Sequence, residues 1–463
     1  MEDKPSGKMD MSQIQAVNKV KYALPSNLNI VERRTNKVNF ADQNAYSSQS
    51  GNEVVIRLQA STDYVYGKNC YLAMDIECAA AGSEIGFVNN TAMSIFERVL
   101  YEDRSGAELE RNDAINRYVA QVCPLHWSKE YVSTAVANAG QFASGFNTHN
   151  VSIPENNSYQ KNGTIVNYNT QGSKLTVIIP LHWFLGVYNQ ETLIPSMLVS
   201  GSLIRLQLAR AGVAFENLDG TDNITSYTIN NPRVVLDSLT LAPVVQKNLM
   251  EQSQAGGGLD FCYETAYYQS GNPGTLSNFN LQVNKAVSRC QRLYWSSHSQ
   301  ETPEESYNAT QGASIDNLGT GRLNVSQLDY RLGDLYFPQR VITVTAGNPQ
   351  KNGGELYENT LQSIHRMKTS VDPPSISKDE FCRSGTALNA TAAQNNNNGK
   401  AVHCQSFEMS SALEYSGLAI NNSRTLEARI NFVVPVASAQ VVDAWICYLK
   451  LAKCNQLRSV IKE

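Results

Sequence analysis

Six histidines are the first residues in this sequence that could do metal or acid–base chemistry. They are His126, His149, His182, His298, His365 and His403. No two of them are spaced as His-x-His, and no H-E-x-x-H motif occurs. His126 and His182 each lie in a Pro-Leu-His-Trp string within an apolar segment, beside a tryptophan. We therefore expect packed or interface histidines rather than metal ligands.

Asp237 and Asp443 are carboxylates at corresponding places in two similar stretches of the chain. Two carboxylates can hydrolyse a glycoside only when they flank the same bond, and residues in separate halves would lie far apart. The nucleophile motif G-x-S-x-G and the phosphate loop G-x-x-x-x-G-K-[ST] are both absent. We expect hydrogen-bonded or solvated strand residues here. The sequence thus predicts no catalytic, cofactor or metal site, and a protein that is not an enzyme.

The nine cysteines are odd in number and contain no C-x-x-C pair. This pattern is typical of free thiols in a reducing compartment, rather than of a disulfide framework or a zinc site. No run of about 18 apolar residues occurs, so we expect no membrane-spanning helix. The first thirty residues lack the apolar core of a secretory signal, so we expect no cleaved leader.

The composition indicates a β-rich protein with many polar turns. Of the 463 residues (51.0 kDa), 17% are charged, which is below the ~25% usual for soluble proteins. Asn, Gln, Ser and Thr take the place of the missing charge. This excludes a disordered chain and a long-helix protein, both of which are rich in Glu and Lys. The length allows two or three domains, each with its own core.

Period-two alternation predicts antiparallel strands along most of the chain. In one of them Ile204, Leu206 and Leu208 would face the core. The predicted strands are Glu53–Gln59, Cys70–Cys78, Leu175–Ile179, Ser202–Leu208, Val234–Leu241, Leu259–Tyr268, Ser288–Trp295 and Thr425–Val433.

Two short helices are predicted between the strands. Residues 105–108 (Ser-Gly-Ala-Glu) form a capping-box pattern, followed by apolar residues at helical spacing. We therefore expect a helix over Ala107–Val122, stopped by Pro124. A second helix is expected over Glu355–Met367, with Tyr357, Leu361 and Ile364 on one face.

The chain has the pattern of one plan used twice. In each half, strands, a helix, an alternating strand and a Val-rich strand follow in the same order, and a Gly-rich joint over 255–258 separates the halves. The predicted fold class is all-β, with two consecutive eight-stranded jelly-roll β-sandwiches, short helices in the loops and an extended N-terminal arm. We expect the arm over 1–50, the first jelly roll over 51–254 and the second over 255–463, ending in a short basic tail. Long polar loops over 142–172, 299–321 and 387–401 are expected to be exposed.

The order of these pieces resembles the double jelly-roll major capsid proteins of polinton-like viruses, virophages and nucleocytoplasmic large DNA viruses. The resemblance covers roughly residues 40–455 and depends on the order and spacing of several short strings. These strings are Ile179-Pro180-Leu181, Leu193-Ile194-Pro195, Gly201-Ser202-Leu203-Ile204-Arg205-Leu206, Tyr227-Thr228-Ile229-Asn230-Asn231-Pro232, Tyr330-Arg331-Leu332-Gly333 and Phe337-Pro338.

The resemblance implies a structural function. In this family three copies form a homotrimeric capsomer (hexon) with sixfold pseudo-symmetry, because each copy contributes two similar sandwiches. Capsomers then assemble the icosahedral shell of a double-stranded DNA virus inside the host cell, in the cytoplasm or nucleus. The implied partners are neighbouring capsomers, penton proteins and minor capsid or cement proteins.

Both ends of the chain are basic. Residues 1–37 carry seven cations against four carboxylates (+3), residues 445–463 carry four against one (+3), and the whole chain is −4, so the middle is −10. We expect the terminal cations to face the inside of a shell and to contact neighbouring subunits or minor capsid proteins. A charge of +3 allows only weak, non-specific, salt-sensitive contact with packaged DNA. The cations are Lys4, Lys8, Lys19, Lys21, Arg33, Arg34, Lys37, Lys450, Lys453, Arg458 and Lys462.

Two other functions remain open from the residues alone, since a jelly roll does not fix function. The first is a viral or cellular two-sandwich protein that binds a carbohydrate or a receptor. Against it stand the missing secretion signal, the missing disulfide framework and the lack of an obvious aromatic platform. The second is an enzyme on a cupin-like sandwich, which would need a His/carboxylate metal set. The double length and the motif order favour the capsid interpretation.

Overall fold

The structure is a computed structural model of the chain. The residues that it describes are 30–48, 53–79, 85–87, 92–131, 134, 139, 175–217, 226–255, 258–299, 307–308, 325–344, 353–366, 374–382, 401–408, 417–421, 424–432, 440–454 and 459–462.

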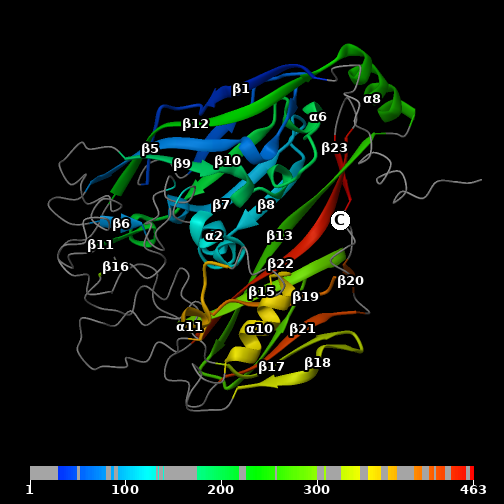
Figure 1. Ribbon diagram of the computed structural model, residues 1–463. Helices are drawn as coiled ribbons and strands as arrows, with labels where there is room; N and C mark the ends of the chain where they lie inside the picture. The colour runs from blue at the N-terminus through cyan, green and yellow to red at the C-terminus, as the bar shows by residue number, and fades with distance from the viewer. Residues whose placement is uncertain are drawn as a thin grey trace, which may run out of the picture.

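The first half of the chain forms a sandwich of two antiparallel sheets (Figure 1). One sheet has the order β1-β12-β5-β9, with two short strands, β2 and β4, beside β12. The facing sheet has the order β3-β10-β7-β8. The strands are β1 (Ile30–Phe40), β2 (Ala45–Ser47), β3 (Glu53–Arg57), β4 (Tyr64–Val65), β5 (Tyr71–Ala79), β7 (Phe96–Glu102), β8 (Glu108–Asp113), β9 (Leu175–Pro180), β10 (Leu203–Leu208) and β12 (Ser226–Leu241).

The second half repeats this arrangement. Its sheets have the orders β13-β22-β15-β19 and β14-β21-β17-β18, and β20 and β23 add to the first of them. The strands are β13 (Leu259–Gly274), β14 (Asn278–Gln282), β15 (Val287–Ser299), β17 (Val325–Leu332), β18 (Leu335–Thr343), β19 (His403–Ser406), β20 (Leu418–Ile420), β21 (Leu426–Phe432), β22 (Gln440–Cys454) and β23 (Ser459–Lys462). A third, small sheet joins β6 (Ile85–Phe87), β11 (Phe215–Asn217) and β16 (Tyr307–Asn308).

The winding of both halves is that of a jelly roll. When the eight main strands of a half are numbered along the chain, one sheet contains strands 1, 8, 3 and 6, and the facing sheet contains strands 2, 7, 4 and 5. The same order holds in the other half, so each half is one eight-stranded jelly roll. The predicted all-β double jelly roll is therefore confirmed, and so is the duplicated plan.

The alternation in the sequence places the core. In β10 the side chains of Ile204, Leu206 and Leu208 are buried between the two sheets, as predicted, and in β5 Leu72 and Met74 are fully buried. Each half has its own apolar cluster. Because side chains in a strand alternate between faces, one period-two pattern fixes which face of each sheet is buried.

The helices are short and lie between strands. In both halves the fifth strand is followed by a helix and then by the sixth strand, with α2 at this place in the first half and α10 in the second. The helices are α2 (Ile115–Gln121), α3 (Cys123–His126), α4 (Lys129–Tyr131), α6 (Ser196–Val199), α7 (Ala211–Ala214), α8 (Pro243–Ala255), α10 (Gly354–Ser363) and α11 (Lys378–Phe381), and the 3-10 turns are η1 (Gly67–Asn69), η3 (Ala92–Ile95), η7 (Leu181–Trp183) and η8 (Gly186–Tyr188). Within the described ranges, none is long and apolar enough to cross a membrane.

The predicted start of the first helix was wrong. Ser105 and Gly106 belong to the turn of the β7–β8 hairpin, where Asp103 Oδ1 accepts hydrogen bonds from the backbone N–H groups of Ser105 (2.8 Å) and Ala107 (2.9 Å). The Ser105 hydroxyl donates to the same carboxylate instead of capping a helix. Ser105 is a residue type that suits a tight turn as well as a helix N-cap, and Gly106 adopts the φ of +82° that this turn requires. The sequence pattern alone therefore did not distinguish the hairpin turn from a helix start. The helix begins only at Ile115, and Pro124 lies in the first turn of α3 rather than acting as a stop.

Part of the expected N-terminal arm is a strand. Residues 30–40 form β1, which pairs antiparallel with β12 from Ile30↔Leu241 to Phe40↔Arg233. The apolar residues of this segment are too scattered to predict a strand. Its backbone is held in place by hydrogen bonds to β12. Residues 1–29 and the greater part of the three long polar loops lie outside the described residues.

Candidate functional site

The predicted terminal cations fall in several places. Lys4, Lys8, Lys19, Lys21 and Arg458 lie outside the described residues. Arg33, Arg34 and Lys37 are on β1, and the Arg34 guanidinium pairs with Glu32 at 2.9 Å.

Three of the four C-terminal cations lie in strands rather than in a free tail. Lys450 and Lys453 are on β22, and Lys462 is on β23. Lys450 is only 5% exposed in the single chain. The structure therefore does not gather the predicted cations into one exposed basic patch among the described residues.

Asp237 and Asp443 both lie in the eighth strand of their jelly roll, and each is buried beside an arginine. Asp237 Oδ1 accepts a hydrogen bond from Arg33 Nε on β1 at 3.0 Å, and Asn69 donates to Oδ2 at 2.7 Å. The hydrogen bond from Arg33 holds the pKa of Asp237 below its usual value. Asp443 pairs with Arg117 at 3.0 Å and accepts the Tyr268 hydroxyl at 2.7 Å. We expected these carboxylates to be either hydrogen-bonded or solvated strand residues. Both are hydrogen-bonded, and both are buried.

The two Pro-Leu-His-Trp strings meet in space. They end α3 and form η7, and the Trp127 and Trp183 rings lie 4.7 Å apart. His126 Nε2 lies 2.9 Å from the Tyr294 hydroxyl, so the imidazole bridges the first half to β15 of the second. Burial lowers the pKa of His126 to about 3 and that of His182 to about 4, so both rings are neutral at pH 7.

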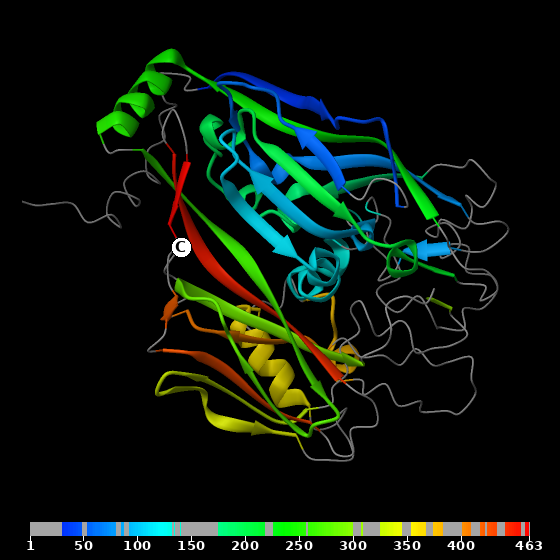
Figure 2. The ribbon, with the colours of Figure 1, turned by 180° about the vertical axis from the view of Figure 1, so that it is seen from behind.

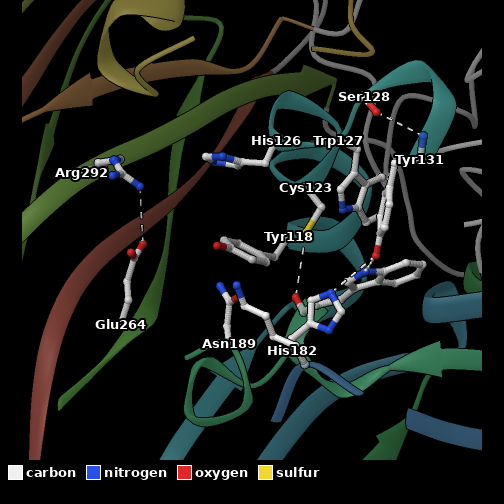
Figure 3. A pocket seen from close by; sticks show the side chains of 12 residues that line it. Tyr118, Cys123, His126, Trp127, Ser128, Tyr131, His182, Asn189, Glu264 and Arg292 are labelled. Atoms are coloured by element: carbon white, nitrogen blue, oxygen red, sulfur yellow. Dashed lines mark hydrogen bonds and ion pairs between the residues drawn. The ribbon is translucent and has the colours of Figure 1, made fainter. Parts of the chain in front are cut away.

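These two histidines line a pocket of about 460 Å³ between the jelly rolls (Figure 3). In Figure 3, Arg292 and Glu264 of the second jelly roll lie on one side, and His126, Tyr118 and Asn189 of the first lie on the other. The remaining lining residues are Lys68, Cys123, Trp127, Ser128, Tyr131, His182 and Trp183. The pocket is thus part of the junction between the two sandwiches.

The pocket is polar but has no reactive pair among the residues that line it. Arg292 pairs with Glu264 (3.9 Å) and Glu408 (3.0 Å), which balances its charge. Burial raises the pKa of the Cys123 thiol, which therefore stays protonated. In the part of the chain that the structure describes, no group of His, Cys, Asp or Glu side chains could hold a metal ion. The arrangement can fix the two halves against each other, and it offers no nucleophile with a base beside it.

Two of the other histidines, His403 and His365, do not line this pocket. His403 stacks on Trp295 in the second core, with ring centroids 4.3 Å apart, and burial lowers its pKa to about 3. His365 Nε2 lies 2.5 Å from Glu408 Oε2. His149 lies outside the described residues, as does the side chain of His298.

A buried carboxylate that the sequence did not single out lies at the centre of the junction. Glu110 on β8 is 1% exposed and accepts hydrogen bonds from the backbone N–H groups of Gly186 (2.9 Å) and Val187 (3.2 Å) and from Thr265 Oγ1 on β13 (3.0 Å). Burial raises the pKa of Glu110, although these hydrogen bonds oppose the shift. Beside it, the Tyr263 hydroxyl donates to the Leu109 carbonyl.

The backbones of the two halves approach closely at Gly186. A Cβ at this position would lie 1.6 Å from the Glu264 carbonyl oxygen. The apolar cluster of the first half also includes Phe261, Tyr263 and Ala452 from the second. No local sequence signal marks Glu110, Gly186 or Arg292, because their partners are distant in the chain. The repeated Pro-Leu-His-Trp string predicted packed or interface histidines and did not locate this junction.

Comparison with known proteins supports the fold. No protein-family model and no curated protein matches the sequence. Among solved structures, the chain is similar to a chain of the Sputnik virophage determined by cryo-electron microscopy (TM-score 0.61, 10% identity, covering 100% of this chain and 92% of that one). It is similar to the Faustovirus major capsid protein (0.59, 7%, 96% and 94%) and to the mavirus major capsid protein (0.54, 12%, 100% and 96%). At these identities the likeness concerns the fold, and the chain has the double jelly-roll fold of these proteins along nearly its whole length.

Proposed function

We propose that this chain is the major capsid protein of an icosahedral double-stranded DNA virus, and that it acts in the virion as a homotrimer with sixfold pseudo-symmetry. The observation that carries the proposal is the repeated winding: two jelly rolls with the same strand order in one chain. Similarity along nearly the whole chain to the major capsid proteins of Faustovirus and mavirus supports it. Two similar sandwiches per chain let three copies present six similar units, and cyclic symmetry is common for homo-oligomers.

The junction supports the same function. A capsomer needs two sandwiches held at a fixed angle, because their outer faces must meet neighbours in a defined geometry. The buried contacts of Glu110, the Arg117–Asp443 ion pair and the close approach at Gly186 supply that rigidity within one chain. Buried, hydrogen-bonded charge pairs are sensitive to geometry, so they oppose rotation of one half against the other.

The division of the chain belongs to the proposal. We place an arm at 1–50, the first jelly roll at 51–254 and the second at 255–463, and the arm supplies β1 as the first strand of the first jelly roll. The cations near the termini would contact neighbouring capsomers, penton proteins or minor capsid proteins on the inner face. Their small net charge would allow weak, non-specific contact with DNA.

The oligomer mass tests the function directly. Light scattering of the purified protein at low and moderate salt is expected to give a species of about three times 51.0 kDa, or much larger particles. Obligate interfaces bury on the order of 2,000–5,000 Å², so the trimer should survive dilution. A clean monomer at every concentration would contradict the proposal, and glycan-binding screens would then test the carbohydrate-binding alternative.

A deletion tests the terminal contacts separately. Removing residues 1–29 leaves β1 intact, so we expect folded trimers with an unchanged melting temperature but a loss of shell assembly, as seen by electron microscopy. A deletion of residues 1–40 is the control, because it also removes β1 and should lower the melting temperature. Normal shells from the shorter deletion would show that residues 1–29 are not needed for contacts between capsomers.

A further inference from the structure

The pocket between the jelly rolls carries charges of both signs. Its two histidines are neutral at pH 7, so the charges of its lining come from Lys68, Arg292 and Glu264. Lys68 is on η1 of the first half, whereas Glu264 and Arg292 are on β13 and β15 of the second. Both views show β13 and β15 on the side of the second sandwich that faces the first (Figure 1, Figure 2). A molecule in the pocket would therefore contact both jelly rolls.

Glu264 is a carboxylate that has an ion pair but no hydrogen bond. Its distance to Arg292 is 3.9 Å, which is too long for a hydrogen bond, and Arg292 lies closer to Glu408, at 3.0 Å. Within the described ranges, no other group donates a hydrogen bond to the Glu264 side chain. This side chain is 34% exposed and lines the pocket. Glu264 can therefore accept hydrogen bonds from a cation that enters the pocket.

Three uncharged polar groups in the lining also lack partners. The Tyr118 hydroxyl, the Trp127 indole N–H and the Asn189 side-chain amide make no hydrogen bond with any part of the chain that the structure describes. Figure 3 shows the Tyr118 hydroxyl directed toward the side of the pocket where Glu264 lies. A polar group that is removed from water without a partner costs free energy. A bound molecule with its own donors and acceptors would recover this cost.

Lys68 offers a cation that can exchange its partner. Its ammonium pairs with Glu191, whose side chain is 78% exposed. Ion pairs between exposed side chains contribute little to stability, so the carboxylate of a ligand can replace Glu191 at small cost. Apolar surface is also available, because the clustered rings of Trp127, Trp183 and Tyr131 line the same pocket.

We propose that this pocket binds a free amino acid with an apolar side chain, in its zwitterionic form. The ammonium of the ligand donates to the Glu264 carboxylate and to the Tyr118 hydroxyl oxygen. Its carboxylate accepts hydrogen bonds from Lys68 and from the Trp127 N–H, and its side chain packs on the clustered rings. The volume of about 460 Å³ is within the range of small-molecule sites.

The charges of the pocket favour a zwitterion over a simple ion. A ligand with only an ammonium would be repelled by Lys68 and Arg292, and one with only a carboxylate would be repelled by Glu264 and Glu408. A zwitterion adds no net charge and places each of its groups beside the opposite one. The inference does not rest on the proposed function, because the pocket lies within one chain. Since the ligand contacts both jelly rolls of the folded chain, its binding should stabilise that chain.

Calorimetric titration of the full-length protein with L-phenylalanine tests the site. We expect one molecule to bind per chain, with a dissociation constant below about 1 mM, and the melting temperature to rise with ligand concentration. Phenethylamine lacks the carboxylate and hydrocinnamate lacks the ammonium, so each should bind at least about tenfold more weakly. Equal affinity for phenylalanine and either analogue would contradict a zwitterion site. Failure of phenylalanine to bind at about 10 mM would overturn the proposal.

Charge-removing variants locate the binding. Glu264→Gln should weaken phenylalanine binding at least about tenfold, because the ammonium loses its opposite charge. The matched control is Glu251→Gln on α8, which removes the same charge from a side chain that is 61% exposed and does not line the pocket. It should leave the affinity unchanged. Lys68→Met should make phenylalanine bind no better than phenethylamine. Unchanged binding in the Glu264 and Lys68 variants would place the ligand elsewhere and overturn the site.

Tyr118→Phe separates binding from folding. The hydroxyl has no partner among the described residues, so its removal should leave the melting temperature of the free protein unchanged, while the ring keeps its contact with Trp445. Phenylalanine binding should fall about fivefold, as expected for the loss of one hydrogen bond. A lower melting temperature with unchanged binding would show that the hydroxyl is structural and would contradict its place in the site. A trimer that binds no amino acid would leave the proposed capsid function standing.

Discussion

Asp237 and Asp443 lie in the same strand of two similarly wound sandwiches, yet their partners come from different places. Asp237 is paired with Arg33 on the neighbouring strand of its own sheet. Asp443 has Ser270 opposite it on β13, and its arginine is Arg117, on α2 of the other jelly roll. The first jelly roll thus completes its buried charge by itself, whereas the second depends on the first. The difference shows that the buried carboxylate of the second jelly roll is neutralised only across the junction, whereas that of the first is neutralised within its own sheet.

The largest expected difference comes from removing the two arginines. Arg117→Met should leave Asp443 buried without its cation and lower the free energy of unfolding by about 3–5 kcal/mol. Arg33→Met should cost clearly less, because the Arg33 side chain is half-exposed and water can reach the edge strand. Chemical denaturation of both variants measures the difference. Equal losses would show that the junction ion pair has no special role.

Two glycines sharpen the same comparison. Gly186→Ala would place a methyl group against the Glu264 carbonyl at the junction, and we expect a loss of at least about 3 kcal/mol as the halves are forced apart. Gly106→Ala, in the exposed β7–β8 turn, has nothing near its Cβ and is strained only by φ +82°. Its expected loss is about 1 kcal/mol. Similar melting temperatures for the two variants would contradict a close-packed junction.

Acid should act on the junction and on the second core through their neutral histidines. His126 and His403 have pKa values lowered by burial to about 3, so their contribution to stability is present above the unfolded value of 6.5 and is lost as the pH falls below it. The expected slope is about 1.4 kcal/mol per pH unit for each ring. Glu110 acts in the opposite sense, because its raised pKa makes the folded state lose stability as the pH rises through that value.

Replacing one ring at a time separates the two regions. His126→Gln keeps a hydrogen-bond partner for Tyr294. Between pH 6.5 and 4.5 it should reduce the change in unfolding free energy by about 1.4 kcal/mol per pH unit, as measured by denaturation at each pH. His403→Phe keeps the stack on Trp295 and should do the same for the second core. An unchanged slope in either variant would show that the replaced histidine does not titrate on unfolding.

Much of the fold could be predicted from the sequence, because strand alternation is local information. The pattern at Ile204, Leu206 and Leu208 alone decides which face of β10 is buried, and the motif order suggested the double jelly roll. The capping-box error shows the limit, since Asp103, Ser105 and Gly106 serve a hairpin turn as well as a helix start. The N-terminal strand was missed because β1 is held by pairing with β12, which lies about two hundred residues away.

Most of the junction between the two jelly rolls could not be predicted from the sequence. No local motif surrounds Glu110, Thr265 or Arg292 in the sequence. Their buried contacts join residues that are distant in the chain and form only when the two sandwiches pack together. His126 and His182 were interpreted as packed or interface histidines, and they do lie between the two halves. The shared string around them reflects a common position at the pocket, which the sequence could suggest but not locate.

The central claim is that two equivalent jelly rolls per chain build a pseudo-sixfold trimer. Electron cryo-microscopy of the purified oligomer tests it most directly. The account predicts particles with exact threefold symmetry and six similar lobes, in which each copy contributes two adjacent lobes. A ring with another number of copies, a two-fold dimer, or a monomer would contradict it.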